Sequence, residues 1–195
     1  MLKSIIATAP LFVASAFALP SWGPWNGKGP QGACLSDSTV QSIISDYTYL
    51  LRFPQGADFN ATANALLSDS FFVSSDSINT LAHIPVSCAI LLHDERDTNI
   101  LSQLGVNAYP SKQAFIAGQA QTPAIPQLAT LGYFYNCNEI AWRWNGSGIG
   151  SNKLEVKGII TFDVNATTSQ VNGVYSEFNS AAWLTDIGNP ECQTA

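Results

Sequence analysis

The stretch LEVKGIITFDV, residues 154–164, is the part of the chain that decides its fold. On one side of this stretch every second residue is apolar or glycine: Leu154, Val156, Gly158, Ile160, Phe162 and Val164. The residues between them are polar, with Ile159 as the exception. Because successive side chains of a strand point to opposite faces of a sheet, this alternation predicts a strand with one buried face.

Two further long β segments are predicted around this strand, at residues 131–144 and 171–183, and the second ends in a short aromatic element. The Gly-, Ser- and Asn-rich residues 145–152 are typical of a hairpin turn. Helical patterns lie upstream. A chain whose helices come first and whose strands follow is expected to be α+β, with the helices on one face of a curved antiparallel sheet. Such an arrangement usually encloses a pocket.

The clearest helical pattern covers residues 40–51, where the apolar side chains form one stripe. Ser38 and Gln41 predict a capping box near its start, and Pro54-Gln55-Gly56 is expected to end it. The other expected elements upstream of the sheet are a helix over 60–67, a short strand over 71–73 and a third helix over 111–117 that Ser111 caps.

The first 18 residues are predicted to be a secretory signal peptide. Lys3 gives the positive start, an apolar run extends from Ile5 to Phe17, and Ala16-Phe17-Ala18 fits a cleavage site. Residues 19–33, rich in Gly, Pro and Trp, are predicted to be a flexible leader. No later stretch is long and apolar enough for a membrane anchor, so the mature protein is expected to be extracellular and without a membrane partner.

The charge and the sequons fit this compartment. The formal net charge is −6, from 8 Lys and Arg against 14 Asp and Glu, so no nucleic-acid partner is expected. Sequons at Asn60, Asn145 and Asn165 predict N-linked glycans. Each of these asparagines is expected at a helix start or in a turn, where a glycan has room.

The cysteines are Cys34, Cys88, Cys137 and Cys192. In an oxidising compartment four cysteines suggest two disulfides, with three possible connectivities. We expect Cys34 to pair with Cys192, which joins the start of the first helix to the tail, and Cys88 to pair with Cys137. The cysteine spacing is not that of a zinc site and histidine occurs only twice, so no metal is expected.

Four motifs resemble a family of secreted proteins from filamentous fungi within the nuclear transport factor 2-like (SnoaL-like) superfamily: SDSIN at 75–79, PSKQAF at 110–115, IAWRW at 140–144 and VYSEFNSAAWL at 174–184. The resemblance covers one domain, roughly residues 34–192. It implies a cone-shaped, strongly bent antiparallel sheet around about three helices, often as a homodimer. Enzymes on this scaffold include scytalone dehydratase and ketosteroid isomerase, whereas many members are not catalytic.

Residues 86–103 depart from that family, whose members run almost directly from the segment that matches Leu81–Pro85 to the one that matches Leu104-Gly105. The 18 residues correspond to 54 nucleotides, a typical length for a fungal intron. We hypothesise that they are an intron retained in the translated sequence. The alternative is a genuine surface loop with a strand at 88–92, which the even number of cysteines favours.

Codon choices allow splice signals within this segment. Val86-Ser87 can be encoded as GTA-AGT, a donor site, and Thr98-Asn99 as ACT-AAC, which contains a branch point. Gln103 can be CAG, an acceptor site. Sequencing of the cDNA is expected to show a transcript without these 54 nucleotides; a mature transcript that retains them would reject the intron.

A hydrolase is not expected. A catalytic triad needs a base, normally histidine, and only His83 and His93 occur, the second within the doubtful insertion. No serine lies in a nucleophile elbow. The GSGIG stretch at 146–150 lacks the lysine and the following helix of a phosphate loop. No cofactor is expected either.

The remaining enzymatic hypothesis is acid–base chemistry inside the cone, where a carboxylate or histidine works with a tyrosine in an apolar pocket. Nine residues are candidates for such a pocket: Asp69, Asp76, Tyr133, Tyr135, Trp142, Arg143, Trp144, Tyr175 and Glu177. Structural roles compete with this interpretation. The aspartates could form caps or turns, Glu177 could pair with Arg143, and the tryptophans could be core residues.

Three functions follow from the sequence. The first is non-catalytic binding of a small hydrophobic ligand or a partner in an apolar pocket. The second is a cofactor-free dehydratase or isomerase for a small hydrophobic metabolite. The third is a structural or surface-interaction protein whose cone is filled by its own side chains. Pocket volume separates the third from the others, and an ionisable group in the pocket separates the second from the first.

Overall fold

The computed structural model describes residues 34–83 and 104–188, all within the unit Gly32–Ala195. The predicted signal peptide, the leader and the doubtful insertion lie outside the described residues. Within the described residues, no helix is both long enough and apolar enough to cross a bilayer.

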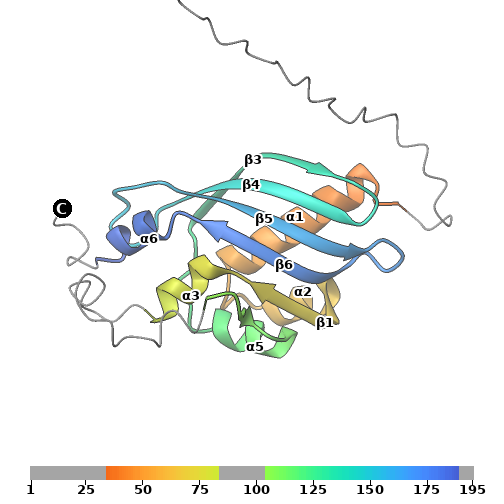
Figure 1. Cartoon of the computed structure of the whole chain (residues 1–195), viewed down its shortest axis with the longest axis horizontal. Coiled ribbons are helices and arrows are strands. Elements are labelled where there is room, and N and C mark those ends of the chain that lie inside the picture. Colours follow the sequence, from red (N-terminus) through yellow and green to blue (C-terminus); the bar gives the residue numbers. More distant parts are fainter. Residues whose placement is uncertain (1–33, 84–103, 189–195) are drawn as a thin grey trace, which may run out of the picture. The chain divides into compact units, whose positions relative to one another are not determined.

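Six strands form one bent sheet in the order β2-β1-β6-β5-β4-β3 (Figure 1). The strands are β1 (Leu67–Ser74), β2 (Asn107–Tyr109), β3 (Gln127–Tyr135), β4 (Glu139–Ser147), β5 (Val156–Asn165) and β6 (Gln170–Phe178). Neighbouring strands run antiparallel except β1 and β6, which are parallel. The sheet is therefore mixed, and the expectation of a purely antiparallel sheet is corrected. In the chain, β1 and β6 are separated by α3, α5 and the four other strands, so no hairpin forces them to be antiparallel.

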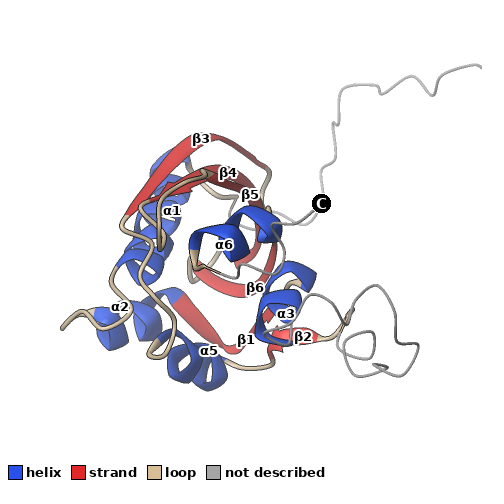
Figure 2. Cartoon of the chain, turned by 90° about the vertical axis from the view of Figure 1, so that its left-hand side faces the viewer, coloured by secondary structure: helices blue, strands red, loops and turns tan. Residues whose placement is uncertain are grey.

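Five described helices accompany the sheet: α1 (Asp37–Arg52), α2 (Phe59–Leu66), α3 (Asp76–His83), α5 (Lys112–Gln119) and α6 (Ser180–Asp186). Figure 2 shows the strands as an arc, with α1 and α2 on its inner side and α6 across one end. This is the predicted α+β arrangement. It contains one helix, α3, that was not predicted from the sequence.

The apolar stripe of α1 is buried, as predicted, through Val40, Ile43, Ile44, Tyr47 and Leu50. Its cap differs from the prediction, because the Ser36 hydroxyl, and not that of Ser38, accepts the Thr39 amide at 3.1 Å. The helix starts two residues earlier than the capping-box pattern suggested.

The cap predicted for the third helix is confirmed. The Ser111 hydroxyl accepts a hydrogen bond from the amide of Ala114 at 3.1 Å, at the start of α5. The last helix, α6, begins in the same way, with the Asn179 side chain accepting from the amide of Ala182 at 3.1 Å.

The segment predicted as one strand over residues 131–144 is a hairpin of two strands, β3 and β4. The turn between them is held by Asn136, whose side-chain oxygen accepts from the amides of Asn138 and Glu139 at 2.9 and 2.8 Å. Because β4 continues to Ser147, the predicted turn over residues 145–152 begins later than expected.

The alternation predicted for residues 154–164 is present in β5. Ile160 and Phe162 on the inner face are buried, whereas Ile159 on the outer face is 51% exposed. In the register of the sheet, Ile160 lies between Trp142 of β4 and Ser176 of β6. Inner-face residues of β4, β5 and β6 therefore form rows across the sheet, and these rows supply most of the core on this side.

Cys34 is joined to Cys137, so the expected pairs Cys34–Cys192 and Cys88–Cys137 are both wrong. The start of α1 lies beside the β3–β4 turn, where the Leu35 amide also donates to the Cys137 carbonyl at 3.2 Å. This proximity depends on the docking of α1 along the sheet, which cysteine spacing does not reveal. Cys88 and Cys192 lie outside the described residues.

The three sequons differ in their surroundings. Asn60 at the start of α2 and Asn165 at the end of β5 are exposed. Asn145, which was expected in a turn, lies inside β4, is half-buried, and its side chain hydrogen bonds to Glu155. Glycosylation stays a prediction, with Asn60 and Asn165 the better placed acceptors.

Replacing Cys34 and Cys137 together by serine is expected to lower the free energy of unfolding by about 2–4 kcal/mol, because the bond closes a long loop in the unfolded chain. Urea unfolding of the variant and of the oxidised wild type measures this difference. A non-reducing peptide map is expected to link the peptides that contain these two cysteines. A map that links Cys34 to Cys192 would contradict the pairing.

Candidate ligand-binding cavity

A cavity of about 270 Å³ lies between the inner face of the sheet and the helices. Its walls come from α1, α3, α5 and the loop after α5 on one side, and from β1, β2, β4, β5, β6 and α6 on the other. Because segments far apart in the sequence supply these walls, the cavity exists only when helices and sheet are packed together. Its volume is slightly below the usual range for small-molecule sites, which is about 300–1,000 Å³.

The described residues that line the cavity include no Asp, Glu, His, Lys or Arg. Most are aliphatic or aromatic. The polar ones are neutral: Tyr47, Tyr109, Gln119, Gln121, Thr122 and Ser176. Such a lining favours uncharged apolar ligands, since a buried charge would find no opposite charge on these walls.

Three aromatic side chains form one wall. The ring centroids of Trp144 and Phe178 are 6.1 Å apart, and those of Phe178 and Trp183 are 5.4 Å apart. Gly158 makes room for this wall, because a Cβ at that position would lie 2.6 Å from Cζ2 of Trp144. The indole therefore lies over the backbone of β5.

Tyr47 of α1 lies at the opposite wall and is 3% exposed. Its ring packs edge-on against Phe162 at a centroid distance of 5.1 Å and stacks with Phe115 at 6.1 Å. Burial raises the pKa of the Tyr47 phenol well above its ordinary value of 10.0, and the neighbouring Tyr109 raises it further. The hydroxyl is thus a neutral hydrogen-bonding group and a poor base at neutral pH.

Of the nine residues predicted for a pocket, Trp144 alone lines this cavity. Trp142 is a core residue, which was the alternative to a pocket role for the tryptophans. Its indole nitrogen donates to the Thr130 hydroxyl at 3.0 Å. Tyr133 joins β3 to α1, since its hydroxyl donates to Asp37 at 3.1 Å. These contacts give Trp142 and Tyr133 structural roles.

Three more of the predicted residues lie away from the cavity. Arg143 and Tyr175 are exposed on the outer face of the sheet, and the Tyr175 ring meets Phe72 edge-on at 5.6 Å. Tyr135, at the end of β3, is 40% exposed and borders a second hollow together with Tyr175. None of the three lines the cavity.

Glu177 also points away from the cavity, and its carboxylate caps α3. It accepts from the amides of Asp76 and Ser77 at 2.8 and 3.0 Å, and from the Ser77 hydroxyl. The ion pair with Arg143, considered as the alternative to a catalytic role, does not occur, because β5 separates the two strands that carry these residues. Asp76 itself accepts from the amide of Gly105 at 2.7 Å.

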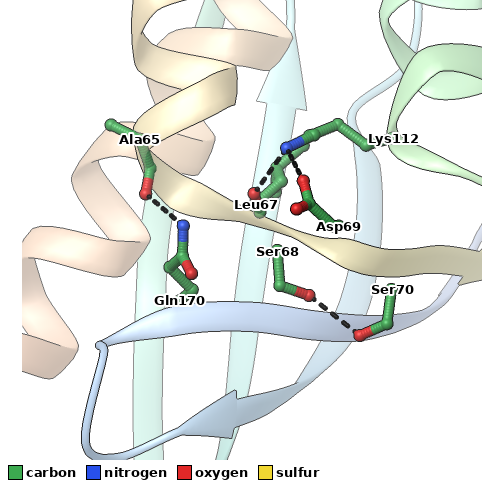
Figure 3. Close-up of polar contacts among 7 residues, drawn as sticks. All are labelled: Ala65, Leu67, Ser68, Asp69, Ser70, Lys112 and Gln170. Carbon is green, nitrogen blue, oxygen red and sulfur yellow. Dashed lines mark hydrogen bonds and ion pairs between the residues drawn. The ribbon is translucent and has the colours of Figure 1, made fainter.

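Asp69 is on the surface, where it pairs with Lys112 of α5 (Figure 3). Lys112 Nζ lies 2.7 Å from the carboxylate of Asp69 and donates to the carbonyl of Leu67 at 3.3 Å. The hydrogen bond from Lys112, and then its charge, lower the pKa of Asp69. The pair fastens α5 to β1 and so supports the cavity wall that α5 provides.

Sequence reasoning missed two cavity residues for which a signal existed. Ser176 lies on the same side of its strand as the apolar Val174 and Phe178, and a serine in such a row is a signal of an unusual position. Tyr47 falls on the buried stripe of α1, where its hydroxyl could have been noticed. Gln119 and Thr122 carried no such signal, because their orientation depends on how α5 docks.

The comparisons with known proteins agree with this architecture. A family model described as an NTF2-like domain matches residues 33–190. No curated protein matches the chain.

Solved structures share the fold at low sequence identity. A hypothetical protein with a ketosteroid isomerase-like fold from Catenulispora acidiphila, in complex with trimethylamine, aligns with a TM-score of 0.51 at 11% identity, over 78% of this chain and 97% of that one. TsrD from Streptomyces laurentii gives 0.50 at 10%, over 80% and 98%. A putative SnoaL-like polyketide cyclase from Jannaschia gives 0.49 at 12%, over 82% and 99%.

The raised pKa of Tyr47 predicts a loss of stability at high pH. The folded protein holds the phenolic proton more tightly than the unfolded chain, so this contribution is complete below about pH 10 and is lost as the pH rises further. The free energy of unfolding is expected to fall by up to about 1.4 kcal/mol per pH unit from this group.

Urea unfolding of the wild type and of Tyr47→Phe at pH 8 to about pH 11 measures this slope. The variant is expected to show a shallower decline, whereas Tyr135→Phe, an exposed control, is expected to follow the wild type. Equal slopes for all three proteins would show that Tyr47 titrates normally.

Proposed function

This chain is a member of the NTF2-like domain family, and from that premise we propose that it binds a small, uncharged hydrophobic molecule in its cavity without catalysing a reaction. The observation that carries the proposal is the lining: a volume of about 270 Å³ whose described walls are apolar or neutral. Burial of an apolar ligand there supplies the binding free energy.

The lining also favours binding over acid–base catalysis. A dehydratase or isomerase without a cofactor needs a group that takes a proton near neutral pH, normally a carboxylate or histidine. Among the described lining residues there is none, and Tyr47 holds its proton too tightly for this role. The carboxylates considered for catalysis, Asp69, Asp76 and Glu177, hold α3 and α5 in place from outside the cavity.

The cavity argues against the third function, a structural or surface-interaction protein whose cone is filled by its own side chains. An engineered cavity of about 150 Å³ accommodates benzene, so a volume of 270 Å³ is large enough for an organic ligand. The related fold from Catenulispora acidiphila, solved with trimethylamine, supports the view that this architecture can hold a small molecule.

Secretion belongs to the same proposal. The disulfide Cys34–Cys137 supports it, because such bonds persist in oxidising compartments. Recovery of the chain from the medium with Leu19 as its first residue would agree with the proposed cleavage, whereas retention inside the cell would not. The homodimer that the resemblance implies stays a prediction, which analytical ultracentrifugation would test.

Ala82→Trp is expected to block ligand binding. Ala82 is exposed on α3 and lines the cavity, so an indole there occupies the space with little effect on the core. Calorimetric titration with propylbenzene, an uncharged apolar probe, is expected to show binding to the wild type. In the variant, affinity is expected to be weaker by at least about tenfold, or about 1.4 kcal/mol.

Ala117→Trp is the matched control. Ala117 is exposed on α5 but does not line the cavity, so this variant is expected to bind propylbenzene like the wild type. No measurable binding to the wild type, or equal binding to the wild type and Ala82→Trp, would reject the cavity as the binding site.

A further inference from the structure

Two tryptophans on the inner face of β4 differ in how their indole nitrogens are satisfied. Nε1 of Trp142 donates to the Thr130 hydroxyl at 3.0 Å. Trp144 is only 2% exposed, and its buried Nε1 has no hydrogen-bond partner. A buried donor without a partner costs free energy, and Trp144 is the one of the two that lines the cavity.

The position of the indole brings this donor toward β6. A Cβ on Gly158 would lie 2.7 Å from Cε2 of Trp144, the ring carbon bonded to Nε1, so this edge of the indole lies over β5. Gly158 pairs with Phe178 of β6, and Ser176 is the next residue of β6 on the same inner face.

Ser176 is a second hydrogen-bonding group at this end of the cavity. It is 6% exposed and interrupts an apolar face between Val174 and Phe178. Its hydroxyl forms no hydrogen bond with any described residue, while that of Thr122, another lining residue, donates to the Gly118 carbonyl at 3.0 Å. An indole N–H that only donates and a hydroxyl that can donate thus belong to adjacent rows of the inner face, Trp144–Gly158–Phe178 and Trp142–Ile160–Ser176.

We propose that Trp144 Nε1 and Ser176 Oγ form the polar end of the cavity and select an uncharged ligand that carries an acceptor oxygen, of the ketone or ester class. This inference rests on the proposed function and specifies the ligand. An indole N–H can be satisfied only by an acceptor. Because Nε1 has less than 1 Å² of accessible surface in this structure, a small shift of the indole accompanies its hydrogen bond to the ligand's oxygen. A carboxylate is disfavoured, because the described lining contains no cation to pair with it.

The volume limits the size of the ligand. Since benzene occupies an engineered cavity of about 150 Å³, a volume of 270 Å³ suits a molecule of roughly ten non-hydrogen atoms. Propiophenone, a ketone, and propylbenzene, the hydrocarbon of the same skeleton, are therefore a matched pair of probes that differ in the acceptor oxygen.

The test compares the affinities of the two probes by calorimetry in the wild type, Ser176→Ala and Trp144→Phe. Each substitution removes one polar group, so each is expected to lower the ratio of ketone affinity to hydrocarbon affinity by about three- to tenfold. Ser70→Ala, on the exposed surface, is the control and should leave the ratio unchanged.

The ratio separates this inference from the proposed function. If propylbenzene binds the wild type but the ratio stays the same in both variants, the polar end does not select the ligand and the inference is overturned. If neither probe binds the wild type, both the proposed function and this inference fail. Trp144→Phe leaves a space in the core, so urea unfolding checks that it is folded, and Ser176→Ala alone decides the question if it is not.

The anion 3-phenylpropanoate provides a second, independent check. It has a similar skeleton, but its charge would lie among uncharged walls, so it is expected to bind at least about tenfold more weakly than propiophenone. Binding of this anion as tightly as the ketone would contradict a polar end that selects uncharged oxygen.

Discussion

The whole arrangement depends on the alternation of side chains across β4, β5 and β6. Residues at even positions, such as Trp142 and Ile160, point inward in register, and α1 covers them with its own apolar stripe. A shift of one residue in any of these strands would turn its buried face outward. Because the rows end in Ser176 and Phe178 on β6, the same register that builds the core also determines which side chains border the cavity.

The helices that close the cavity are attached to the sheet by polar contacts made outside it. The carboxylate of Glu177 reaches the first amides of α3, and Lys112 holds α5 against β1. A carboxylate at a helix start is favoured by the unpaired amides and by the helix dipole. This division of roles explains why the charged residues of the domain are absent from the described lining. They position the walls, and the walls themselves are left apolar.

Much of the fold could be predicted from the sequence, because α1, β5 and the cap at Ser111 depend on local patterns. What required the structure was contact between distant segments. The helix α3 is capped by Glu177, about a hundred residues away, and the turn at Asn136 is hidden inside one apolar stretch. The site was predicted less well, since most candidates were chosen for their chemistry. Tyr175 and Glu177 carry suitable groups, yet in the sequence they alternate with Val174, Ser176 and Phe178 and so belong to the opposite face of the strand.

The bond between Cys34 and Cys137 gives the chain an unequal covalent architecture. Both cysteines lie at the outer ends of one continuous stretch that holds α1, α2, β1, α3, β2, α5 and β3. Even when denatured, that stretch remains a closed ring, whereas β4, β5 and β6 stay on a free arm. Excision of residues 86–103 would make the ring smaller without opening it, so this crosslink can form in the longer and in the shorter polypeptide alike.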